Sequence, residues 1–188
     1  MKPRNIPLLA ACAAALLLSG CETFGFGKKN SDDDIIPTVV KKKADYGQAY
    51  KDYVELGAQY LQMGRYDLAE PKLQRAIEID SHPPEAWNIL AVLYEEKRDI
   101  ASGNQVYQKL IHSHPEYLLG YTNYVTFLCK FDRDSEMQTL LGQMRGRNAE
   151  FKAAAGIAEG NCMQRRGQSG TAENAYKQAL AANPQAEG

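Results

Sequence analysis

The chain has 188 residues, a formal net charge of −1, 44% hydrophobic residues and four cysteines. This length is enough for one domain, or a short repeat array, with a core of its own. The balance of 22 basic and 23 acidic residues argues against a nucleic-acid-binding protein, because such proteins concentrate positive charge on one face.

The first 20 residues have the composition of an export signal. Lys2 and Arg4 precede an apolar run of 13 residues from Ile6 to Leu18, and Ser19 and Gly20 follow this run. Such a run is too short to span a membrane, and small residues at its end are typical of a cleavage point. We therefore predict a signal peptide over residues 1–20.

The end of this segment, Leu18-Ser19-Gly20-Cys21, resembles the lipobox of bacterial lipoproteins. The resemblance implies a diacylglycerol on the Cys21 thiol, cleavage before Cys21 and an acyl chain on the new amino group. Several acyl chains hold a protein durably on a membrane. Since Glu22 is not the aspartate that retains many such lipoproteins at the inner membrane, we expect an outer-membrane anchor facing the periplasm. The alternative is an ordinary secretory signal followed by a cysteine.

Residues 21–45 are predicted to form a lipidated, disordered tether. Glycines, the acidic run 32–34 and the lysine run 41–43 occur here without helical periodicity. Low hydrophobicity and blocks of like charge favour disorder. For the lysine run, contact with anionic headgroups or with another protein is the alternative to simple solvation.

A period of 34 residues organises the region 46–188. The first position of the repeat recurs at intervals of 34, 34 and 35 residues, and a second position follows twelve residues after each first one. This order is typical of the tetratricopeptide repeat, in which small side chains allow two helices to pack closely. The first positions are Gly57, Ala91, Val125 and Gly160, and the second positions are Ala69, Gly103, Met137 and Ala172.

We therefore predict an all-α tetratricopeptide superhelical solenoid of about four helix pairs, with repeats at about 50–83, 84–117, 118–152 and 153–186. In the fourth repeat, Gly156 stands where a bulky residue is usual, so we expect its first helix to be the most loosely packed. The third repeat has no proline near Ala149 to end its second helix.

Such an array leaves a concave groove lined by the first helix of each pair, and its usual role is to bind protein segments. By helical position, six residues are expected to face a partner: Val54, Ala58, Leu61, Asn88, Val92 and Glu95. The apolar strip in the first repeat favours an apolar strand or helix as the ligand. The alternative is that Val54 and Leu61 belong partly to the core.

Catalytic, metal and cofactor sites are not expected. His82, His112 and His114 have no third ligand at a suitable spacing, so a surface-loop role is favoured. We find no pattern typical of a nucleophilic triad or a phosphate-binding loop. We therefore expect no enzyme activity, no small-molecule substrate and no cofactor other than the acyl groups on Cys21.

Two cysteines remain after the signal is removed and Cys21 is acylated. Cys129 and Cys162 both fall late on the first helices of adjacent repeats, and these helices lie side by side in such a stack. Because exported compartments are oxidising, we predict a structural disulfide between them. Two buried free thiols are the alternative.

Lipobox, tether and tandem repeats together resemble the type IV pilus pilotin family of tetratricopeptide lipoproteins (PilF/PilW-like). Local sequences carry the resemblance: Tyr60-Leu61 with Gly64 and Tyr66, Asn123-Tyr124 with Phe127-Leu128-Cys129, and Gly160-Asn161-Cys162. The resemblance implies a lipoprotein that binds the outer-membrane secretin subunit and promotes its ring assembly. A lipoprotein adaptor that scaffolds cell-wall enzymes or outer-membrane protein assembly is the alternative.

Overall fold

The computed structural model describes residues 45–185, and within this range it contains helices and no strands. The signal peptide, Cys21 and the tether predicted over 21–45 lie outside the described residues, apart from Asp45. No helix in residues 45–185 combines the length and the apolar character needed to cross a membrane. The helices are α1 (Tyr46–Gln62), α2 (Tyr66–Ile79), α3 (Pro84–Glu96), α4 (Ile100–Ser113), α5 (Leu118–Lys130), α6 (Asp134–Arg145), α7 (Ala149–Arg165) and α8 (Ser169–Ala182).

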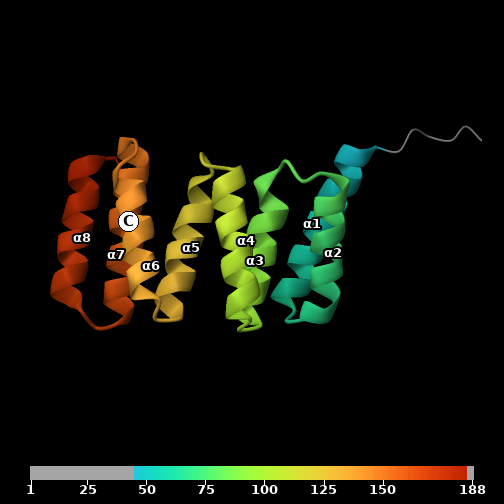
Figure 1. The fold of residues 1–188 in the computed structure, drawn as a ribbon, viewed down its shortest axis with the longest axis horizontal. Coiled ribbons are helices and arrows are strands. Elements are labelled where there is room, and N and C mark those ends of the chain that lie inside the picture. Colours follow the sequence, from blue (N-terminus) through green and yellow to red (C-terminus); the bar gives the residue numbers. More distant parts are fainter. Residues whose placement is uncertain (1–44, 186–188) are drawn as a thin grey trace, which may run out of the picture. The chain divides into compact units, whose positions relative to one another are not determined.

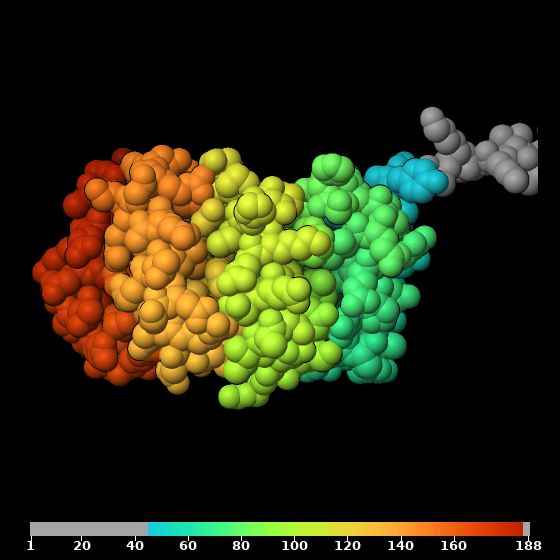
Figure 2. All heavy atoms as spheres, viewed as in Figure 1, coloured from blue at the N-terminus to red at the C-terminus, as the bar shows by residue number. Residues whose placement is uncertain are grey.

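The helices form four antiparallel pairs that follow one another in chain order (Figures 1 and 2). Each helix packs against the next one in the chain, and α1, α3, α5 and α7 also pack against one another in sequence. This arrangement confirms the predicted tetratricopeptide solenoid of four pairs.

The two helices of a pair have different neighbours, and this difference defines the inner side of the stack. The backbones of the first helices approach one another along the array, whereas those of α2, α4, α6 and α8 do not come close to one another in residues 45–185. Because the first helices lie closer together, the stack curves toward them. The expected groove is therefore on the side of α1, α3, α5 and α7.

Short polar caps and left-handed residues set the helix boundaries. Asp45, Asp99 and Asn148 each accept a hydrogen bond from a backbone N–H of the following helix, which satisfies one of its free donors. The turn inside each pair contains one residue with positive φ, and glycine fills this position only in the first and fourth turns, as Gly64 and Gly167. These turns let the second helix reverse direction within a few residues.

A large aromatic cluster joins the second and third pairs. Tyr107 of α4 stacks on Tyr124 of α5 with ring centroids 5.2 Å apart, and Phe127 lies 5.3 Å from Tyr107. Tyr107 and Phe127 are fully buried. Space for Phe127 comes from Gly103, since a Cβ atom there would lie 2.8 Å from the Phe127 ring. The small position of the second repeat therefore admits an aromatic residue of the third.

The expectation that the fourth repeat has the loosest first helix is wrong. A Cβ atom on Gly156 would lie 2.7 Å from the backbone oxygen of Ala175, and one on Gly160 would lie 2.3 Å from the Tyr176 ring. The missing bulk at Gly156 thus brings the α7 backbone directly against α8. Close contact between small residues replaces the usual large side chain, and much of α7 is buried.

Arg147 occupies the short connection between α6 and α7, where no proline ends the second helix. Its guanidinium donates hydrogen bonds to the Pro115 carbonyl and the Glu116 carboxylate, and it lies 3.9 Å from the centroid of the Phe151 ring. It also donates to the Tyr121 hydroxyl at 3.1 Å. One side chain therefore ties the α6–α7 connection to the α4–α5 connection.

We expect Arg147→Ala to lower the free energy of unfolding by about 1–2 kcal/mol, because charge-assisted hydrogen bonds and a cation–π contact are lost together. Arg147→Lys should recover only part of this loss, since an ammonium cannot reproduce the planar, multiply bonded contact. Urea denaturation monitored by circular dichroism measures both effects. Arg65→Ala is the matched control, because Arg65 forms only an exposed pair with Asp67 at 3.5 Å. Equal losses at both positions would contradict the assigned role of Arg147.

Candidate protein-binding groove

The six residues expected to face a partner fall into three groups in the structure. Val54 and Leu61 are half-buried and pack against apolar clusters: Val54 joins the cluster around Tyr50, and Leu61 joins the cluster that includes Leu73. The alternative that both belong partly to the core is therefore the better description. Their outer surfaces remain available to a ligand.

Ala58 and Val92 are the apolar groove residues that contribute least to the core. Both are half-buried, and neither belongs to any of the three apolar clusters found in residues 45–185. Val92 lies on α3, between the first and third pairs, so a ligand along the groove would pass over it. It is the most suitable position at which to test ligand binding without disturbing the core.

Asn88 and Glu95 are much less accessible than their helical positions suggest. Asn88 is 8% exposed, and its side-chain oxygen accepts a hydrogen bond from Asn123 at 3.0 Å. Glu95 is 9% exposed and forms an ion pair with Lys130 at 3.0 Å. Both side chains thus connect α3 to α5, and the groove floor is polar at this point.

In the ion pair at the centre of the groove, Glu95 is the buried partner and Lys130 is the more exposed one. The Tyr107 hydroxyl donates to Glu95 at 3.5 Å, and burial followed by the nearby Glu95 charge raises the pKa of Tyr107. Partial burial alone would lower the pKa of Lys130, but hydrogen bonds to Glu95 and Glu96 outweigh this effect and raise it. Lys130 therefore stays charged at neutral pH.

The third and fourth pairs are linked covalently by a buried disulfide. Cys129 of α5 and Cys162 of α7 form a disulfide bond, with their Cα atoms 6.0 Å apart. Arg166 donates a hydrogen bond to the Cys129 carbonyl at 3.1 Å and pairs with Asp134 at 2.8 Å. A cavity of about 460 Å³ opens beside these groups. Its walls are Glu95, Thr126, Cys129, Lys130, Asp132, Arg165 and Arg166.

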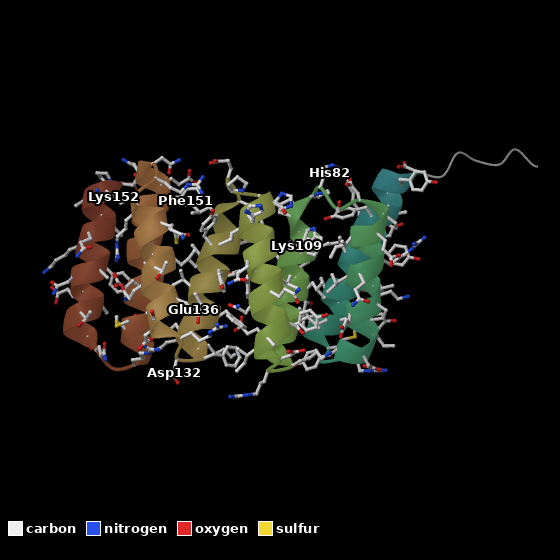
Figure 3. The ribbon with its side chains drawn as sticks, viewed as in Figure 1. His82, Lys109, Asp132, Glu136, Phe151 and Lys152 are labelled. Atoms are coloured by element: carbon white, nitrogen blue, oxygen red, sulfur yellow. A yellow bond between two sulfur atoms is a disulfide. The ribbon has the colours of Figure 1, made fainter. Side chains whose placement is uncertain are left out.

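The opposite end of the groove has a different character. There, a cavity of about 450 Å³ lies between the start of α1 and the start of α3, and Tyr50, Val54 and Pro83 form its apolar lining. Figure 3 shows the two edges of the array, with His82 in the α2–α3 connection and Asp132 in the α5–α6 turn at opposite ends of the helices. The cavity beside Tyr50 opens near the His82 edge. Asp80 lines this cavity and accepts a hydrogen bond from the His82 backbone N–H.

Sequence reasoning missed both cavities and the basic groups at the disulfide. The repeat pattern could have identified Lys130 and Arg165, because each occupies the last turn of a first helix. Their equivalents in the first two pairs are Gln62 and Glu96, so the charge of this position changes along the groove. This change from neutral to acidic to basic side chains is visible in the sequence once the repeats are aligned.

Comparison with known proteins agrees with this architecture. The family model described as a tetratricopeptide repeat matches residues 54–117. The type IV pilus assembly protein PilF of Pseudomonas aeruginosa is 30% identical over 122 residues, which cover 65% of this chain and 44% of that protein. The chain therefore spans less than half the length of this curated relative.

Solved structures show the same fold. A structure from the functional characterisation of Pseudomonas aeruginosa pilF has a TM-score of 0.59 at 23% identity, covering 76% of this chain and 65% of that one. The crystal structure of PilW, described as a widely conserved type IV pilus biogenesis factor, has a TM-score of 0.56 at 23% identity and covers 73% of this chain and 64% of that one. At this level of identity the likeness concerns the fold.

Proposed function

Because this chain is a tetratricopeptide repeat protein related to the type IV pilus assembly proteins PilF and PilW, we propose that it acts as a pilotin for the type IV pilus secretin. In this role it binds the secretin subunit in the groove of α1, α3, α5 and α7. The acyl groups on Cys21 hold the complex at the outer membrane, facing the periplasm, where the subunits assemble into a ring. The observation that carries the proposal is the 30% identity to PilF over 122 residues.

The groove supports protein binding in physical terms. Its first half offers apolar surface at Val54, Ala58 and Val92, and its second half offers cations at Lys130 and Arg165. An apolar stretch and a charged stretch along one path suit a peptide segment better than a small molecule. A membrane anchor shared by the two proteins would raise their effective concentration.

Deletion of the gene in the parent organism tests the proposal. We expect secretin multimers and surface pili to be lost together, while secretin monomers persist. If the lipid anchor directs the protein to the outer membrane, complementation with Cys21→Ser should restore neither the secretin multimers nor the pili. Labelled palmitate should be incorporated into the wild-type chain but not into this variant. Normal rings and pili with an altered cell shape would favour the alternative, an adaptor that scaffolds cell-wall enzymes or outer-membrane protein assembly.

Val92→Arg is expected to weaken binding of the purified secretin subunit by at least about tenfold, because the long charged side chain blocks the groove between the first and third pairs. Isothermal titration calorimetry measures the affinity, and thermal unfolding should change little because Val92 is outside the apolar clusters.

Two variants serve as references for this test. Leu180→Arg introduces the same side chain on the second helix of the last pair, where Leu180 is 52% exposed, and should leave binding unchanged. Leu61→Asp should reduce thermal stability, since Leu61 packs against the cluster containing Leu73. Unchanged affinity of Val92→Arg would place the binding surface elsewhere.

A further inference from the structure

The cavity at the first end of the groove has an apolar floor. Tyr50, Val54 and Pro83 form this floor between the start of α1 and the start of α3. Tyr50 is 7% exposed, and its hydroxyl accepts a hydrogen bond from the Ala86 backbone N–H at 3.3 Å, so the ring is held in place. The volume of about 450 Å³ lies within the range of about 300–1,000 Å³ that is typical of ligand pockets.

Three carboxylates and one ammonium group line the same cavity. They belong to Glu55, Asp80, Glu85 and Lys51. Asp80 already accepts a hydrogen bond from the His82 backbone N–H. Glu55 and Glu85 are exposed, and neither forms an ion pair with any group in residues 45–185. Burial, followed by the negative charges of Glu85 and Asp80, raises the pKa of Tyr50 to about 12, so these charges act at the apolar floor.

The acidic side chains are a feature of the first pair and not of the repeat. One repeat further along the chain, the residues that correspond to Glu55, Asp80 and Glu85 are Ile89, His114 and Leu119. The cations Lys130 and Arg165 line the cavity at the other end of the groove. The two ends of the groove therefore differ in charge, and the first end favours a basic ligand group over an acidic one.

We propose that this cavity binds a partner segment in which two aliphatic side chains lie next to an arginine or a lysine. The aliphatic side chains pack on Tyr50, Val54 and Pro83, and burial of their apolar surface supplies most of the affinity. The cation faces Glu55 and Glu85 and supplies selectivity, because exposed charge pairs add little affinity but disfavour ligands of the wrong charge. That the segment belongs to the secretin subunit rests on the proposed function, whereas the preference for this chemistry does not.

Three synthetic peptides test this preference without the secretin. The probe is acetyl-Gly-Leu-Leu-Arg-Gly-amide, and the other two peptides replace its arginine by glutamate or both of its leucines by serine. An NMR titration of the isotope-labelled full chain in detergent follows the Ala86 amide, which donates to the Tyr50 hydroxyl at the cavity floor. We expect the arginine peptide to shift this amide saturably. Each altered peptide should bind at least about tenfold more weakly at a salt concentration of about 0.05 M, where screening is weak.

Matched variants of the chain separate this site from general charge effects. Glu55→Gln/Glu85→Gln should weaken binding of the arginine peptide by about fivefold, because the cation loses both free carboxylates. Glu55→Lys/Glu85→Lys should reverse the preference, so that the glutamate peptide binds more tightly than the arginine peptide, a gain that unfolding cannot produce. Glu150→Gln/Glu173→Gln removes two charges from exposed positions on α7 and α8 and should change neither affinity. Thermal unfolding of each variant is measured in parallel.

Four results would overturn the proposal. The first is the absence of a saturable shift of the Ala86 amide with the arginine peptide, and the second is equal affinity for this peptide and either altered one. The third is an equal loss in the Glu150→Gln/Glu173→Gln control, which would indicate attraction to net charge alone. The fourth is a shift that follows protein concentration without any peptide, since a second copy of the chain would then occupy the cavity. The secretin assay bears on none of these outcomes, so failure of this preference and failure of the pilotin role can be told apart.

Discussion

Phe127→Ala is expected to lower the free energy of unfolding by about 3–5 kcal/mol, the range for removal of a fully buried aromatic ring. Phe127 is 0% exposed and contacts the rings of Tyr107, Tyr124 and Phe131. Its ring also fills the space above Gly103, so truncation leaves a cavity between the second and third pairs. Urea denaturation followed by circular dichroism measures the loss.

The location of this cavity predicts a second effect. In a repeat array each pair contacts only its neighbours, so a weakened interface reduces coupling between the two halves. We therefore expect the unfolding transition of Phe127→Ala to broaden or to split into two steps. Phe131→Ala is the control, because Phe131 is only half-buried and should cost clearly less. Similar losses at the two positions would show that the cluster does not join the pairs as described.

Removal of the disulfide should have a comparable effect. Cys129 and Cys162 are separated by 33 residues, and closing a loop of this length stabilises a protein by about 3–4 kcal/mol through the unfolded state. The Cys129→Ala/Cys162→Ala variant should therefore unfold at markedly lower urea concentration. Reduction of the wild type should produce the same change, and reduction of the variant should produce none.

The loss should be concentrated in the last pair. The bond connects α5 to α7, so hydrogen exchange in α7 and α8 should accelerate more than in α1–α3. Alkylation of the native protein without reductant checks the premise, since the bonded pair adds no label. Two alkylated thiols in the native exported protein, or unchanged stability of the double variant, would contradict this expectation.

The small residues of the predicted repeat pattern lie at close contacts between helices in the structure. A Cβ atom on Gly57 would lie 2.7 Å from Leu73, and a Cβ atom on Gly103 or Gly160 would lie similarly close to an aromatic ring. Such contacts are local to two or three helices and recur with the period, so they can be inferred from one sequence. The aromatic residue of the next repeat that fills the space above Gly103 could not be inferred in the same way.

The groove was the harder part to predict. Helical position places Asn88, Glu95 and Leu61 on the inner side, but it does not say how closely the next helix covers them. In the structure α5 buries Asn88 and Glu95 through Asn123 and Lys130, while Leu61 turns toward the cluster around Leu73. Accessibility depends on the distance between helices, which side-chain packing across the repeats sets.

The amino-acid sequence by itself determined the helical repeat, its period, the number of pairs and the pairing partner available to Cys129. These features depend on contacts between residues at fixed spacings, so they are written in the order of small and large side chains. Only the tertiary structure decided that Gly156 tightens α7 against α8, that Arg147 ties the α6–α7 connection to the α4–α5 connection, and that a cavity lined by Asp80 and Glu85 opens beside Tyr50. These features depend on residues from different repeats meeting in space, and no spacing along the chain specifies how close they come.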